Sequence, residues 1–187
     1  LDIVQHSMEK LSRLIQNLFE YSKLEARQIE PLMEPFPISD LAHDVYENYQ
    51  KLAEDKAVKI HLDVEKDLPM VFADISLVER VIQNLMDNAL KFTPAHGEVV
   101  ISLYSDQGQV YVAIRDNGPG IPVHEQPHVF ESFRKAPVMK ERNPGAGLGL
   151  AIAKKIIEIH NCTLSVQSKP PQGTEFRFSL DIVALSS

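Results

Sequence analysis

Polar side chains recur at helical spacing in one segment of the chain, which spans residues 75–92. Three or four positions separate successive members of the set, so on a helix they share one stripe: Arg80, Asn84, Asn88 and Lys91. An asparagine carbonyl oxygen is a hard, neutral ligand for Mg²⁺, and the amide group can donate a hydrogen bond to a phosphate. The stripe indicates a site for a metal-bound phosphate, and the alternative is an ordinary solvated helix face.

A second candidate is the segment Asp116–Gly120, which directly follows an apolar run. A carboxylate at the end of a strand can accept a hydrogen bond from an exocyclic amine, such as that of adenine. Gly118 and Gly120 allow the backbone to approach a flat ring closely. The same residue types also form surface turns, so the alternative is a turn without a ligand.

Two further segments suit an anionic ligand. Phe130 and Phe133 would anchor one end of a mobile loop and leave basic residues 134–135 free, unless both rings are simply core side chains. Glycines within 145–149 precede a predicted helix, where free backbone N–H groups and the helix dipole attract anions. Their spacing matches neither a P-loop nor the dinucleotide-binding fingerprint.

The elements that position these residues are predicted from periodicity and turn residues. Helices are expected over 1–27, 39–55, 75–92 and 148–160, with Ser39 or Asp40 as the N-cap of the second. Strands are expected over 58–64, 98–104, 109–115, 163–167 and 175–182. The irregular stretch 116–146 is typical of a functional loop or lid. Together they predict a two-layer α+β domain, a largely antiparallel sheet with helices on one face.

The first helix carries a heptad seam of apolar residues: Leu1, Val4, Met8, Leu11, Ile15 and Leu18. Leu14, Tyr21 and Leu24 widen this apolar face. We expect the helix to pack in a bundle or dimer, and the alternative is packing onto its own domain. Prolines at 31, 35 and 37 end the helix and define a linker that finishes in a short strand.

The composition restricts the classes of partner. A net charge of −7 repels a phosphate backbone, so nucleic acid is not an expected partner. A single cysteine excludes an intrachain disulfide and a thiolate metal cluster, which fits a cytoplasmic location. The apolar runs are too short to span a bilayer, so membrane attachment is expected only through segments outside this chain.

Taken in order, these segments resemble the GHKL ATPase superfamily, which includes histidine kinases, gyrase-type topoisomerases, ninety-kilodalton heat-shock chaperones and MutL. The asparagine helix resembles the N box, Asp116–Gly120 the first glycine box, Phe130–Phe133 the F box and Gly145–Gly149 the second glycine box. The closing Gly173-Thr174-Glu175-Phe176 is similar to the Gly-Thr-x-Phe of this superfamily. The F box and the end of the first helix favour its bacterial sensor histidine kinase branch.

The resemblance implies a Bergerat-type ATP-binding fold over 38–187, a linker over 28–37 and part of a helical dimerisation domain over 1–27. It implies that Asn88 binds Mg²⁺ and that Asp116 binds the adenine amine. The residues expected to act in catalysis are Asn84, Asn88, Lys91 and Lys135. The other expected ATP contacts are Gly118, Gly120, Ile121, Phe133, Arg134, Gly145, Ala146, Gly147, Leu148, Gly149, Leu150 and Thr174. Residues between the F box and the second glycine box would form the ATP lid.

The sequence departs from the family pattern in three respects. Pro144 stands where the second glycine box often has its first glycine, and Lys135 fits the basic position that follows the F box better than Arg134 does. A phosphoacceptor histidine followed by an acidic residue is missing, and we expect it upstream of this chain. His6 lacks that context and is interpreted as an ordinary surface histidine.

The implied activity is transfer of the γ-phosphoryl group of ATP to a histidine outside this chain. The implied partners are ATP with Mg²⁺, the receiver domain of a response regulator, and a second copy bound through the N-terminal helix. One alternative is a degenerate nucleotide-binding or interaction module. Another is a different GHKL ATPase, which would use a carboxylate of the N-box helix, Glu79 or Asp87, as general base.

Overall fold

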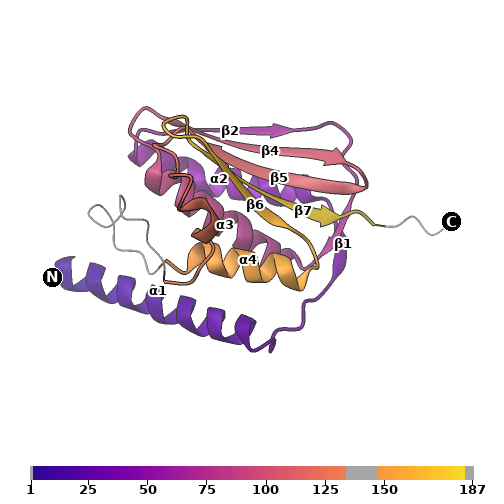
Figure 1. Ribbon diagram of the computed structural model, residues 1–187, viewed down its shortest axis with the longest axis horizontal. Coiled ribbons are helices and arrows are strands. Elements are labelled where there is room, and N and C mark those ends of the chain that lie inside the picture. Colours follow the sequence, from indigo (N-terminus) through magenta and orange to yellow (C-terminus); the bar gives the residue numbers. More distant parts are fainter. Residues whose placement is uncertain (1, 134–146, 184–187) are drawn as a thin grey trace.

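The computed structural model describes residues 2–133 and 147–183 and forms two layers (Figure 1). One layer is a five-stranded sheet, and helices α2, α3 and α4 cover one of its faces. Helix α1 lies on the far side of the helical layer, against α4 (Figure 1). The two-layer α+β architecture predicted from the sequence is confirmed.

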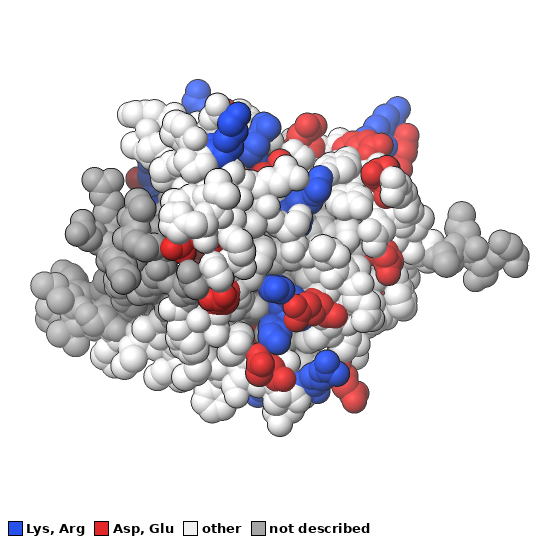
Figure 2. All heavy atoms as spheres, in the orientation of Figure 1, with Lys and Arg blue, Asp and Glu red and all other residues white. Residues whose placement is uncertain are grey.

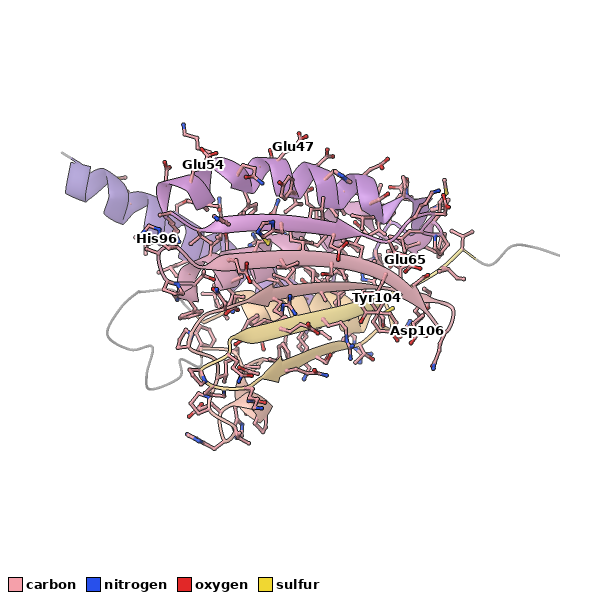
Figure 3. All side chains as sticks on the ribbon, turned by 90° about the horizontal axis from the view of Figure 1, so that it is seen from above. Glu47, Glu54, Glu65, His96, Tyr104 and Asp106 are labelled. Carbon is pink, nitrogen blue, oxygen red and sulfur yellow. The ribbon has the colours of Figure 1, made fainter. Side chains whose placement is uncertain are left out.

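The strand order in the sheet is β2-β4-β5-β7-β6, and Figure 3 shows the strands side by side in this order. The strands are β2 (Lys59–Val64), β4 (Glu98–Asp106), β5 (Gln109–Asp116), β6 (Leu164–Ser168) and β7 (Thr174–Asp181). Only the β2–β4 pair is parallel, so the sheet is largely antiparallel as expected. The β4–β5 turn consists of Gln107 and Gly108, both with positive φ, which matches the twist of a two-residue hairpin.

Helices α2 (Ile38–Asp55), α3 (Ile75–Phe92) and α4 (Gly149–Ile159) bury their apolar faces against the sheet and against one another. The apolar stripe of α3 is fully buried and consists of Val78, Val81, Ile82, Leu85 and Ala89. A short 3-10 helix (Gln126–His128) lies within the irregular stretch after β5. On a neighbouring side of α3, Asn84 is also buried and Asn88 is half-buried.

The start of α2 differs from the prediction. Its N-cap is Pro37, so Ser39 and Asp40 lie in the first turn and neither is the cap. Proline suits the start of a helix because it has no N–H that would lack a partner there. Ile38 is fully buried, and its burial places the first helical residue before Ser39 and Asp40. Asp40 still lies in the first turn, where its charge suits the helix dipole.

A second, two-stranded sheet joins the linker to the start of α3. The short strand expected at the linker end is β1 (Glu34–Phe36), and it pairs with β3 (Val71–Ala73), which the sequence did not predict. Asp74 follows β3 and caps α3 by accepting a hydrogen bond from the backbone N–H of Leu77. Its other oxygen accepts from the backbone N–H of Leu32, so the cap also holds the linker in place.

Helix α1 (Asp2–Glu25) uses its apolar residues in two ways. Near its end, Leu24 is only 2% exposed and Tyr21 packs against the core. Four seam residues remain exposed: Met8 by 67%, Leu11 by 58%, Ile15 by 50% and Leu18 by 48%. Packing onto its own domain therefore explains the end of α1, whereas the seam retains an apolar surface.

The surface of the described residues carries both signs of charge. On the face drawn in Figure 2, basic and acidic side chains are interspersed without a continuous basic field. None of the described helices is long and apolar enough to cross a membrane.

Two glycines with positive φ allow a matched test of the fold. A Cβ on Gly173, where φ is 96°, would overlap the carbonyl oxygen of Asp116, whereas a Cβ on Gly108, where φ is 81°, would meet open space. We expect Gly108→Ala to lower the free energy of unfolding by about 1 kcal/mol, the cost of the left-handed backbone. Gly173→Ala is expected to cost more than about 3 kcal/mol, because it adds a collision within the sheet.

Urea unfolding of both variants measures this difference. Equal losses would contradict the close approach of Gly173 to the end of β5.

Candidate functional site

A pocket lies at the end of the sheet where β5 and β6 finish and β7 begins. In Figure 3 this is the end marked by His96, opposite the end that carries Tyr104 and Asp106. The pocket is lined by Asn88, Phe92, Asp116, Pro119, Gly120, Ile121 and Thr174. Three separate segments of the sequence therefore meet in one pocket: the polar stripe of α3, the segment after β5 and the start of β7.

The inner end of the pocket contains the carboxylate of Asp116, which is only 5% exposed. Asp116 is the last residue of β5 and pairs with Thr174, the first residue of β7. Its Oδ1 accepts a hydrogen bond of 2.8 Å from the backbone N–H of Gly118. Burial raises the pKa of this carboxyl group, and hydrogen bonds from the backbone N–H groups of Gly118 and Thr174 oppose the rise.

Gly118 and Gly120 are required by close packing within the protein. A Cβ on Gly118 would lie 2.8 Å from Oδ1 of Asp116 and 2.9 Å from the carbonyl oxygen of Phe92. Gly120 has a φ of 75°, and a Cβ there would lie 3.0 Å from backbone atoms of Pro170. The sequence predicted that these glycines let the backbone approach a ligand. In the structure they let it approach the protein itself: Gly118 packs against α3 and Gly120 against the β6–β7 connection.

The two asparagines of α3 occupy different positions. Asn88 lines the pocket, whereas Asn84 is only 7% exposed and lies against the start of α4. A Cβ on Gly149 would lie 3.4 Å from Oδ1 of Asn84. Among the described residues, Nδ2 of Asn84 has no hydrogen-bond partner, and a buried amide without one is destabilising. Asn84 therefore places a buried amide, without a hydrogen-bond partner in the described part of the chain, beside the N-terminus of α4.

Lys91 completes the polar stripe next to the pocket. Its Nζ lies 5.0 Å from the centre of the ring of Phe92, a residue that lines the pocket. The remaining residue of the stripe, Arg80, bonds to α1 and does not line the pocket. The predicted stripe is therefore divided between the pocket and the contact with α1.

The N-terminus of α4 has the features expected of an anion site. The helix begins at Gly149, preceded by Gly147 with a φ of 70° and by the buried Leu148. Its first backbone N–H groups and its dipole favour negative charge, and Leu150 follows in the first turn. Four other residues expected to contact ATP lie outside the described residues: Arg134, Lys135, Gly145 and Ala146.

The two phenylalanines of the predicted loop anchor behave differently. Phe130 packs edge-on against Phe176 with a ring-centre distance of 6.0 Å, so it is anchored to the core. Phe133 is 60% exposed, and the prediction that it anchors the loop through its ring is wrong. Its backbone N–H donates to the carbonyl oxygen of Gly147 at 3.1 Å, so the contact of Phe133 is made by its backbone.

The carboxylates of α3 accept hydrogen bonds from residues outside the pocket. Asp87 accepts a hydrogen bond of 2.8 Å from the hydroxyl of Tyr49 on α2, and Glu79 accepts one from Gln83. Neither residue lines the pocket, where Asp116 is the acidic side chain. Within residues 2–133 and 147–183, no group of three His, Cys, Asp or Glu side chains could hold a metal ion.

Sequence reasoning missed a second layer of residues behind the pocket. Ser168 bonds to the backbone N–H of Ile121 at 2.7 Å, and Gln126 donates to the carbonyl oxygens of Ile121 and Ser168. These side chains hold the loop after β5 against the end of β6. Ser168 lies outside every segment singled out for chemistry, and Gln126 lies within the irregular stretch 116–146 without a motif of its own. Their hydrogen bonds to the pocket loop are visible only in the folded chain.

Arg80 connects α3 to α1 one helical turn before Asn84. Its guanidinium group donates to Glu20 at 2.9 Å and to Asn17 at 2.7 Å. A second ion pair joins Lys155 of α4 to Glu25 at 3.3 Å. Since planar guanidinium groups hold carboxylates in a fixed geometry, this contact orients α1 relative to the pocket helix.

Residues 73–184 match the family described as Histidine kinase-, DNA gyrase B-, and HSP90-like ATPase. The adaptive-response sensory kinase SasA of Synechocystis sp. is 41% identical over 92% of this chain and 45% of its own length. The crystal structure of full-length ShkA in complex with AMPPNP gives a TM-score of 0.88 at 28% identity, over 98% of this chain and 39% of ShkA. The mycobacterial sensor histidine kinase MprB gives 0.71 at 31% identity, over 82% of this chain and 100% of that structure. The chain thus spans less than half the length of SasA.

Removal of the Arg80 side chain tests whether its hydrogen bonds hold α1 in place. Arg80→Ala removes the bonds to Asn17 and Glu20, and we expect the amide groups of residues 14–25 to exchange roughly fivefold faster, as a loss of about 1 kcal/mol implies. Hydrogen–deuterium exchange measures this directly. The matched control is Arg115→Ala, which removes an exposed arginine from β5. Equal exchange in α1 for wild type and Arg80→Ala would show that this contact does not hold the helix.

Proposed function

The chain belongs to the histidine kinase-, DNA gyrase B- and HSP90-like ATPases, within the sensor histidine kinases, and we propose that it is the ATP-binding catalytic part of such a kinase. One observation carries the proposal. A buried carboxylate, a pocket asparagine and the N-terminus of a helix, which come from distant segments, converge on one end of the sheet. These groups suit the amine, the metal-bound phosphates and the negative charge of ATP, respectively.

Asp116 is the proposed acceptor for the adenine amine. It is held by the backbone N–H group of Gly118, so its position is fixed before a ligand arrives. Because the group is buried, a charge-assisted hydrogen bond to it is strengthened by the low local dielectric. Thr174 and Ile121 line the pocket beside it and complete the proposed adenine site.

The phosphates are proposed to lie between α3 and the start of α4. Asn84 and Asn88 offer amide oxygens and nitrogens, and Lys91 offers a positive charge. Mg²⁺ commonly takes one or two protein oxygens and completes its shell with phosphate oxygens and water, so this donor set fits the ion without a carboxylate cluster. When bound, Mg²⁺ would neutralise phosphate charge. Asn88 is the proposed protein ligand, and the unpartnered amide of Asn84 is proposed to donate to a phosphate oxygen.

The proposed reaction is transfer of the γ-phosphoryl group to a histidine on another part of the full protein, for relay to the receiver domain of a response regulator. Such transfer depends mainly on positioning and on neutralisation of charge. The exposed seam of α1 supports homodimerisation through this helix, because a wide apolar face is stabilised by burial against a second helix. Residues 1–27 are accordingly proposed to belong to the dimerisation domain, 28–37 to the linker and 38–187 to the catalytic domain.

A different ATPase of this superfamily is less well supported. It would need a general-base carboxylate on the N-box helix directed at the nucleotide, but Asp87 bonds to Tyr49 and Glu79 to Gln83. A degenerate module that binds nucleotide without transferring phosphate keeps the same pocket. Only an activity measurement distinguishes it from a kinase.

The full-length protein, incubated with γ-labelled ATP and Mg²⁺, tests the proposal. A kinase gives a labelled protein whose phosphoryl group is stable to base and labile to acid, as phosphohistidine is. Nucleotide binding without label would instead indicate the degenerate module. Release of phosphate without a labelled protein would indicate an ATPase.

The raised pKa of Asp116 predicts how nucleotide affinity depends on pH. An ionised carboxylate accepts a hydrogen bond from an amine more strongly than a protonated carboxyl group does. Affinity for ADP is therefore expected to fall with decreasing pH, and the fall should start at a higher pH than for an ordinary aspartate. Asp116→Asn is expected to bind roughly 10–100-fold more weakly at neutral pH, because it loses a hydrogen bond to a charged group. It should also lose the part of the pH dependence due to Asp116.

Calorimetry from pH 8 to pH 5 measures the affinity for ADP and its pH dependence in the wild type and in Asp116→Asn. Protonation of ADP itself affects both proteins equally, so it cancels in the comparison. Asp63→Asn, at an exposed position of β2, is the matched control. Unchanged affinity in Asp116→Asn would remove Asp116 from the site.

The role of Asn88 is tested by the dependence of binding on metal. We expect Asn88→Ala to abolish the gain in ADP affinity that Mg²⁺ produces in the wild type, while binding without Mg²⁺ changes little. Titrations with ADP in the presence and absence of Mg²⁺ measure this gain. Asn48→Ala, at an exposed position of α2, is the control. A gain that persists in Asn88→Ala would place the metal elsewhere.

A further inference from the structure

A serine hydroxyl behind the pocket connects three parts of its wall. Ser168 ends β6, and its Oγ accepts a hydrogen bond of 2.7 Å from the backbone N–H of Ile121. The same hydroxyl donates to the carbonyl oxygen of Gly173 at 2.8 Å and lies 3.0 Å from Oγ1 of Thr174. Ile121 and Thr174 line the pocket, whereas Ser168 does not. Any effect of Ser168 on a ligand must therefore pass through its neighbours.

The hydrogen-bonding capacity of this hydroxyl determines the direction of each bond. A serine hydroxyl has one proton and two lone pairs. The N–H of Ile121 occupies one lone pair, and the carbonyl of Gly173, which can only accept, takes the proton. The contact with Thr174 must then be donated by Thr174 into the second lone pair. The single hydroxyl proton of Thr174 is thereby directed at Ser168 and away from the pocket.

The surroundings of Ser168 keep this arrangement in place. Nε2 of Gln126 donates to the carbonyl oxygen of Ile121 at 2.9 Å and to that of Ser168 at 2.8 Å. Ile121 is thus held by both its N–H and its carbonyl group. A Cβ on Gly120 would lie only 3.2 Å from Oγ of Ser168, so the hydroxyl is closely packed.

We propose that Ser168 sets the hydrogen-bond polarity of Thr174 and is a positioning residue that determines specificity. With its proton bonded to Ser168, Thr174 presents only lone pairs to the pocket, opposite the acceptor Asp116 in the β5–β7 register. A wall made of acceptors favours a ligand with an exocyclic amine and rejects one with a carbonyl at the same place. The inference rests on the proposed function, because it takes a 6-aminopurine nucleotide as the ligand.

Calorimetric titrations with ADP and with inosine diphosphate test this proposal. Inosine diphosphate replaces the 6-amino group of ADP by a carbonyl. In Ser168→Ala the hydroxyl of Thr174 can turn its proton toward that carbonyl. We therefore expect the ratio of ADP affinity to inosine diphosphate affinity to fall about fivefold, the worth of one ordinary hydrogen bond.

A second background separates this role from a merely structural one. Thr174→Val removes the hydroxyl that Ser168 orients, so adding Ser168→Ala to it is expected to leave the affinity ratio unchanged. The matched control is Ser165→Ala on the same strand, whose hydroxyl bonds to the backbone of Arg177 and not to the pocket wall. If Ser168→Ala is poorly folded by thermal unfolding, Ser168→Cys is used instead and should lower the ratio in the same direction.

These titrations distinguish a failure of the proposed role of Ser168 from a failure of the proposed function. An unchanged ratio in Ser168→Ala, or an equal fall in the Thr174→Val background, overturns the role of Ser168 while leaving the nucleotide site intact. A wild-type chain that binds no ADP contradicts the proposed function itself.

Discussion

The buried carboxylate of Asp116 is the group on which the site depends. It lies at the end of β5 beside the start of β7, and backbone N–H groups of Gly118 and Thr174 donate to it. A buried charge is tolerated only with such partners, and the surrounding chain is shaped to supply them. Gly118 must lack a Cβ to approach the carboxylate, and Gly173 must lack one to let β7 start against the end of β5. The same packing that stabilises the charge leaves a polar acceptor at the inner end of a pocket.

Helix α3 connects this acceptor to the rest of the molecule because each of its faces has a separate partner. Its apolar stripe is buried in the core, Asn88 faces the pocket, Asp87 bonds to α2 and Arg80 bonds to α1. A displacement of α1 would therefore act on the helix that carries the proposed phosphate and metal contacts. This arrangement gives the proposed dimerisation helix a direct physical connection to the nucleotide pocket.

The sequence predicted those features that depend on local pattern. The bounds of α3 and the largely antiparallel sheet follow from periodicity and turn residues. The meeting of Asn88, Asp116 and Thr174 was expected only from the resemblance to a known family. The cap of α2, strand β3 and the exposure of Phe133 did not follow, because burial of Ile38, a three-residue pairing and a backbone bond to Gly147 depend on tertiary contacts. Ser168 and Gln126 were missed for the same reason, since their importance comes only from the groups they bond to.

A crystal structure of the chain with Mg²⁺ and AMPPNP would show whether Asp116 binds the base. We expect the adenine amine within about 3 Å of the Asp116 carboxylate. We also expect the phosphates at the start of α4, beside Asn84 and Asn88. A nucleotide bound elsewhere, or bound with its base turned away from Asp116, would show that this pocket is not the adenine site.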